Sequence, residues 1–150
     1  MDTAMIFNRF WNRYSTENPG AKRIYDLLTA RGEKVVHDHI ALRTFDDPRM
    51  NIDVIARLFT ENGYEACGNY EFRAKKLRGK HFEHKYDPGA PKVFISELLT
   101  DQFSDYLKTT VRGYLDSLAA SVYAAPDLTY GGSIWGKIAF DTYNRLRQES

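Results

Sequence analysis

The stretch Val35-Val36-His37-Asp38-His39-Ile40-Ala41-Leu42-Arg43-Thr44-Phe45 decides how the rest of the chain is interpreted. Aliphatic and β-branched residues crowd this run, which ends at the turn sequence Asp46-Asp47-Pro48, so we predict a β-strand. Side chains alternate between the two faces of a strand. His37, His39 and Arg43 therefore share one face, and the opposite face is mostly aliphatic.

The spacing of the polar residues on this strand predicts a site. His39 and Arg43 are four residues apart, about 13 Å at the backbone of a strand. One small molecule could then bind to a metal held by His39 and, through a carboxylate, to Arg43. An H-x-H pair on a strand can also place two imidazoles on one metal. Half-buried histidines that bond to their neighbours are the alternative interpretation of this pair, and the commoner one.

Length and composition indicate one globular domain. The chain has 150 residues, of which 43% are hydrophobic and 27% charged, and this balance is typical of a soluble protein with a hydrophobic core. The net charge of +1 gives no electrostatic case for nucleic acid or an anionic membrane as partner. Cys67 is the single cysteine, which excludes an intrachain disulfide. With no signal-peptide pattern at the start, we expect a cytoplasmic protein.

Hydrophobic periodicity predicts the remaining elements. We expect helices over residues 4–14 and from Pro19 to Gly32, and a helix capped by Asn51. Extended segments follow over 64–72, 75–77 and 81–86, with a turn at Gly79, and a further strand over 92–99. Residues 101–118 and those after Ser133 are predicted to be helical. The chain thus divides into N-terminal helices (1–34), a βαβββ module (35–100) and a helical segment (101–150), an α+β fold.

Other polar residues occupy positions that the hydrophobic pattern does not explain. Glu97 shares a strand face with Val93 and Ile95, where alternation predicts an apolar residue. A buried glutamate is normally paired or bound to a metal, so a metal ligand and an ion pair with Arg43 or Arg73 both stay open. His81 and Glu83 share one face of the segment 81–86, and a solvated rim is the plainer interpretation. The basic run from Lys75 to Lys80 indicates either a solvated hairpin or a site that binds an anion.

Three stretches of the sequence resemble the 2-oxoadipate dioxygenase/decarboxylase family, members of which are also labelled hydrolases. They are His37-Asp38-His39-Ile40-Ala41-Leu42-Arg43-Thr44-Phe45, then Tyr70-Glu71-Phe72 with Lys75-Lys76-Leu77, and Val93-Phe94-Ile95-Ser96-Glu97-Leu98-Leu99. The resemblance implies a vicinal-oxygen-chelate, glyoxalase-like fold. It also implies an enzyme that uses non-haem Fe(II) and O₂ to convert 2-oxoadipate to 2-hydroxyglutarate with loss of CO₂.

The resemblance assigns roles to individual residues. His39 becomes a metal ligand and Arg43 the group that binds the carboxylate of a small 2-oxo acid. His37 is then expected either to support a metal ligand or to be a structural histidine, and Glu97 is a ligand by analogy with the wider superfamily only. From the sequence pattern and not from the resemblance, His81, Glu83 and Lys76 are expected at the rim of the substrate site. The cofactor is expected to be Fe(II), with Zn²⁺ or another divalent ion as alternatives.

In the family, a second module supplies another histidine and the glutamate ligand, and the helical segment 101–150 would lead to it. This leaves two expectations: the chain is the N-terminal half of a longer enzyme, or two copies pair as a homodimer. Function is likewise open between an Fe(II) dioxygenase, a binding or interaction module without turnover, and a metal-dependent hydrolase or glyoxalase-like isomerase.

Overall fold

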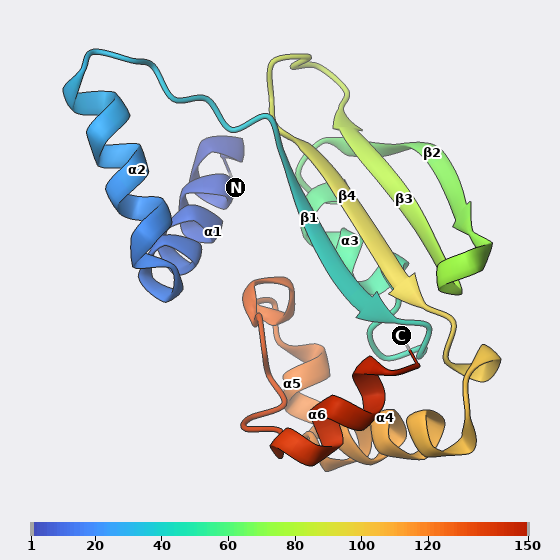
Figure 1. The fold of residues 1–150 in the computed structure, drawn as a ribbon. Helices are drawn as coiled ribbons and strands as arrows, with labels where there is room; N and C mark the ends of the chain where they lie inside the picture. The colour runs from blue at the N-terminus through green and yellow to red at the C-terminus, as the bar shows by residue number, and fades with distance from the viewer. Residues whose placement is uncertain (1, 150) are drawn as a thin grey trace.

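A four-stranded sheet forms the centre of the computed structural model, which describes residues 2–149 (Figure 1). The strand order is β1-β4-β3-β2, and β1 (His39–Phe45) pairs in parallel with β4 (Lys92–Leu98). β3 (Leu77–His84) lies antiparallel between β4 and β2 (Tyr64–Phe72). Helix α3 (Ile52–Thr60) links β1 to β2 and packs behind the sheet in Figure 1. The predicted βαβββ unit and α+β class are confirmed.

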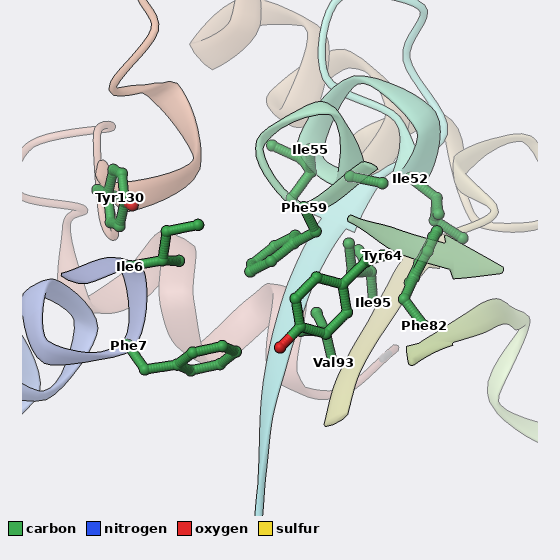
Figure 2. Packing of buried hydrophobic residues seen from close by; sticks show 11 residues of the cluster. Ile6, Phe7, Ile52, Ile55, Phe59, Tyr64, Phe82, Val93, Ile95 and Tyr130 are labelled. Carbon is green, nitrogen blue, oxygen red and sulfur yellow. The ribbon is translucent and has the colours of Figure 1, made fainter. Parts of the chain in front are cut away.

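The core lies on the face of the sheet that α3 covers (Figure 2). Phe59 of α3, Val93 and Ile95 of β4 are completely shielded from solvent. Phe7 reaches this core from α1 (Thr3–Glu17), with its ring centroid 6.4 Å from that of Phe59. Tyr64 packs edge-on against Phe59, and burial raises its pKa to about 12. Residues of α1, α3 and three strands thus share one hydrophobic core, as their apolar spacing predicts.

The C-terminal helices form a second cluster below the sheet (Figure 1). Here α4 (Asp105–Ser117) begins at Ser104, whose hydroxyl accepts a hydrogen bond from the Leu107 backbone NH at 3.3 Å. The short α5 (Ala120–Ala124) and α6 (Phe140–Arg147) follow. Trp135 packs edge-on against Phe45 of β1, 5.7 Å between centroids, which joins this cluster to the sheet.

The second N-terminal helix begins and ends at its predicted proline and glycine, although the Asn18 side chain makes no capping hydrogen bond. Pro19 opens α2 (Pro19–Ala30), and Gly32 follows its end with φ +82°, a left-handed conformation that glycine adopts readily. The Glu33 NH then bonds back to the Leu28 carbonyl, as in a Schellman motif. None of the residues of α2 is buried. In the part of the chain described, no helix is long and apolar enough to span a bilayer.

Three predicted boundaries are wrong, each for a local reason. β1 begins at His39 and not at Val35, because its partner β4 starts after Pro91, which has no NH to continue the ladder. Gly79 lies buried inside β3, and the turn falls at residues 73–76 instead. The last helix starts at Phe140 and not after Ser133, since Gly132 and Gly136 adopt positive φ.

We expect Phe59→Ala to lower the free energy of unfolding by about 3–5 kcal/mol, because it leaves a cavity where two aromatic side chains meet α3. Urea unfolding monitored by circular dichroism measures this change. Met5→Ala is the control, since Met5 lies on the same layer of helices but is 61% exposed, and it should change stability by less than about 0.5 kcal/mol. Equal losses in both variants would contradict the placement of the core.

Candidate active site on the open face of the sheet

No helix of the described chain covers the front of the sheet in Figure 1, and this open face carries the candidate site. Strand register places its side chains in rows across the sheet. The rows pair His39 with Lys92; Ala41 with Phe94, His81 and Gly68; Arg43 with Ser96, Gly79 and Tyr70; and Phe45 with Leu98, Leu77 and Phe72. The middle of the face is therefore floored mostly by small residues, with His39 and Arg43 along one side.

Two glycines allow aromatic rings to lie flat on this floor. A Cβ added at Gly79 would stand 2.7 Å from the Phe94 ring, and one added at Gly68 would stand 2.8 Å from the His81 ring. Any larger residue would push these rings away from the sheet. The glycines thus fix the depth at which Phe94 and His81 sit.

His39 has the surroundings of a metal-binding imidazole. Its Nδ1 lies 2.6 Å from a carboxylate oxygen of Asp38, and the ring is 61% exposed. A carboxylate on one ring nitrogen fixes the orientation of the ring and leaves the other nitrogen, here Nε2, for a metal. Asp38 was not predicted in this role, although an acid directly before the histidine was a visible signal.

Arg43 lies two rows along the same strand with its charge uncompensated. Its Nη1 donates to the Ser96 hydroxyl at 3.5 Å, and no carboxylate among residues 2–149 pairs with it. A cavity of about 860 Å³ lies beside it, and Lys75, Lys76 and Ser96 also line this cavity. An exposed guanidinium over a buried hydroxyl suits a planar carboxylate ligand. Ser96 was not predicted as a site residue. The available signal was its position two residues from Phe94, which places both side chains on the same face of β4.

His81 and Glu83 belong to a polar network beside His39. Nδ1 of His81 lies 2.8 Å from the Tyr70 hydroxyl, and Nε2 lies 3.4 Å from Glu83. Lys92 bonds to Glu83 at 2.9 Å, and this hydrogen bond holds the pKa of Glu83 below its usual value. A cavity of about 370 Å³ is lined by His39, His81 and Glu83 together. The structure thus brings three of the predicted site residues to one depression.

Two predicted site residues do not lie on this face. His37 precedes β1, and its ring packs 5.2 Å from that of Trp11 in α1. Glu97 is only 1% exposed and faces α3, on the opposite side of the sheet from His39. Its Oε2 accepts a hydrogen bond from the Ile52 NH at 2.7 Å, and its Oε1 pairs with Arg78. The structure therefore corrects the assignment of Glu97 as a metal ligand, because strand alternation turns it into the core.

The residues that the structure describes would supply only part of a metal site. Within 2–149, no three histidine, cysteine, aspartate or glutamate side chains converge on one position. His39 with Asp38 fits one ligand and its supporting carboxylate. A catalytic metal bound by protein side chains normally has three such ligands, so a metal at His39 would require further ligands.

A sequence profile of the 2-oxoadipate dioxygenase/decarboxylase family matches residues 6–123. The chain belongs to this family. Enzymes named 2-oxoadipate dioxygenase/decarboxylase from Oryza sativa subsp. japonica and Arabidopsis thaliana are each 32% identical to it over 91% of its length. The chain spans only 41% and 40% of these relatives, about two fifths of their length.

Solved structures of similar fold agree with the family assignment. A provisionally named hydrolase from Shewanella frigidimarina is 40% identical, with a TM-score of 0.89 over 99% of this chain and 57% of its own. Hydroxyglutarate synthase from Oryza sativa, solved in complex with 2-oxoadipate, is 29% identical, with a TM-score of 0.85 over 97% of this chain and 50% of its own. A glyoxalase superfamily protein from Ralstonia eutropha is 25% identical, with a TM-score of 0.65 over 81% of this chain and 39% of its own. The expected glyoxalase-like fold is confirmed.

We expect Glu97→Ala to lower the free energy of unfolding by about 1–3 kcal/mol, because the buried Ile52 NH loses its acceptor. It should leave Fe(II) affinity unchanged at a temperature where the variant is folded. Chemical denaturation and anaerobic titration measure the two quantities. Glu83→Ala, on the open face, is the comparison and should change stability much less, because its ion pairs are exposed to solvent. Weaker Fe(II) binding in folded Glu97→Ala would overturn the structural role.

Proposed function

We propose that this chain supplies one wall of the active site of an Fe(II)-dependent dioxygenase that oxidatively decarboxylates a small 2-oxo acid. One observation carries the proposal: His39 and Arg43 project from the same open face of β1, and Arg43 has no acidic partner among the described residues. The rice relative solved with 2-oxoadipate supports that acid as the first substrate to test.

In this proposal His39 holds the metal through Nε2, and Asp38 keeps the ring in position. When bound, Fe(II) supplies the redox chemistry with O₂ that side chains alone lack. The 61% exposure of His39 leaves the imidazole open to a metal without rearrangement of the core. Zn²⁺ or another divalent ion suits an imidazole as well, so the metal has to be established by measurement.

Arg43 binds and orients a carboxylate of the substrate. Its planar fork offers two parallel NH donors, and Ser96 beneath it limits how the guanidinium can turn. Ala41 lies between His39 and Arg43 and leaves the space above the strand unfilled by a side chain. A 2-oxo acid can therefore lie along β1 with its keto end toward His39.

We further propose that the missing metal ligands come from residues outside this chain. A following segment of the same polypeptide and a second copy of the chain are the two sources. Either would place its ligands over the open face, since the opposite face is filled by α3 and the core.

We expect His39→Ala to weaken Fe(II) binding by at least about tenfold, because losing a ligand removes more than the outer-shell contacts that are worth 10–100-fold. Anaerobic Fe(II) titration measures this. His84→Ala is the control, since His84 packs against Tyr64 on the far side of the sheet, and it should bind Fe(II) like the unmodified chain. Equal binding by all three proteins would refute the role of His39.

We expect Arg43→Met to weaken 2-oxoadipate binding by about tenfold to a hundredfold, because hydrogen bonds to a charged group are worth about 1.5–3 kcal/mol. Calorimetric titration measures the affinity, and Arg57→Met on the exposed side of α3 is the control with the same loss of charge. O₂ consumption with Fe(II) tests turnover. Tight binding without O₂ uptake would favour a binding module, and O₂-independent activity with zinc would favour an isomerase or hydrolase.

A further inference from the structure

The turn between β2 and β3 contains an unusual lysine. Lys76 has φ +51°, and it is the only residue other than glycine with a positive φ in residues 2–149. Left-handed backbone is unfavourable for a lysine, and such conformations concentrate at functional sites. Glycine or asparagine would relax this position. The identity of the side chain therefore needs an explanation beyond the turn.

The backbone of Lys76 is held on both sides. Its NH donates to the Arg73 carbonyl at 3.1 Å, and its carbonyl accepts from the Leu99 NH at 2.9 Å. The half-buried side chain places Nζ 4.4 Å from the centre of the Phe103 ring. The contact with the Phe103 ring thus restricts the position of the ammonium group.

Lys76 and Arg43 line the same cavity, and both lack an acidic partner in the described chain. Neighbouring cations of the sheet are paired: Arg73 with Glu71, Arg78 with Glu97, Lys80 with Asp53, and Lys92 with Glu83. The acid among the described lining residues is Glu149, and its carboxylate is bound by the backbone and hydroxyl of Ser104. Arg43, Lys75 and Lys76 outnumber this one carboxylate, so the described lining of the cavity carries a net positive charge.

The register gives the spacing between the two cations. Arg43 is level with Ser96, while Lys76 bonds to Leu99, three residues further along β4 and two strands across. With about 3.3 Å per residue and about 4.8 Å between strands, their backbones lie about 14 Å apart. Both side chains line the same cavity from backbones this far apart, which leaves room for one carboxylate between them.

We propose that Lys76 determines specificity, as a second cation for the carboxylate that lies farthest from His39 in a dicarboxylic 2-oxo acid. This inference rests on the proposed function, because Arg43 is the first contact for that carboxylate. Together with Arg43, Lys76 then distinguishes a dicarboxylic from a monocarboxylic acid of the same chain length. Charge-assisted contacts from two sides favour the doubly charged ligand and do nothing for an alkyl end.

The test compares two six-carbon acids, 2-oxoadipate and 2-oxohexanoate, which lacks the second carboxylate. Calorimetric titrations with anaerobic Fe(II) present use the unmodified chain and three variants. Lys76→Asn removes the cation but tolerates the left-handed backbone, and Lys76→Arg keeps the charge. Arg73→Asn makes the same charge change in the same turn, at a side chain that is 90% exposed and does not line the cavity. Thermal unfolding of each variant is measured alongside.

We expect Lys76→Asn to reduce the preference for 2-oxoadipate over 2-oxohexanoate by about tenfold, as for one hydrogen bond to a charged group. Lys76→Arg should retain most of the preference, and Arg73→Asn should change it less than about twofold, since an exposed charge is screened. The melting temperature of Lys76→Asn should equal or exceed that of the unmodified chain, which a merely structural lysine would not show.

Two outcomes overturn the inference alone: 2-oxoadipate binding depends on Arg43 while Lys76→Asn keeps the preference, or Arg73→Asn and Lys76→Asn reduce it equally. The second result would mean a diffuse basic field and no specific contact. Failure of the proposed function looks different, because then neither acid binds or Arg43→Met binds 2-oxoadipate normally.

Discussion

The buried carboxylate of Glu97 joins the parts of the βαβββ unit to one another. It accepts a hydrogen bond from the first NH of α3 and pairs with Arg78 on β3, while its own backbone belongs to β4. A negative charge at the positive end of a helix, with a cation on its other oxygen, offsets the cost of burying it. The crossover helix is thereby fixed to the centre of the sheet, and the core closes on that side only.

Closing one face determines what the other can carry. Ser96 is adjacent to Glu97 on β4 but faces the opposite way, so one dipeptide serves the core and the candidate site. His39 and Arg43 contribute no buried apolar surface, and the fold does not depend on their side chains. Their positions follow from the parallel β1–β4 pairing, which is held by backbone hydrogen bonds and by the core behind it. Such a face can take up ligands without reorganising the fold.

Alternation and helical spacing were enough to predict the βαβββ order and the shared face of His39 and Arg43, because both depend on local periodicity. Glu97 shows where that reasoning stops. Its side of the strand was predictable, but its partner is Arg78 and neither Arg43 nor Arg73, because the partner depends on the register of β3 against β4. The same holds for His37, whose contact with Trp11 depends on where α1 docks. Gly79 looked like a turn, yet it gives space to the Phe94 ring.

The open face combines features that single-domain surfaces usually keep apart. Tyr70 and Phe72 are 42% and 39% exposed there, beside an uncompensated arginine and a histidine poised for a metal. Contiguous exposed rings favour contact with another surface. An incomplete ligand set within residues 2–149 makes the same demand on chemical grounds. One covering element would satisfy both, burying the rings while its own side chains complete the coordination of the metal. The hydrophobic contact and the metal would then stabilise each other, because each holds in place the residues that the other requires.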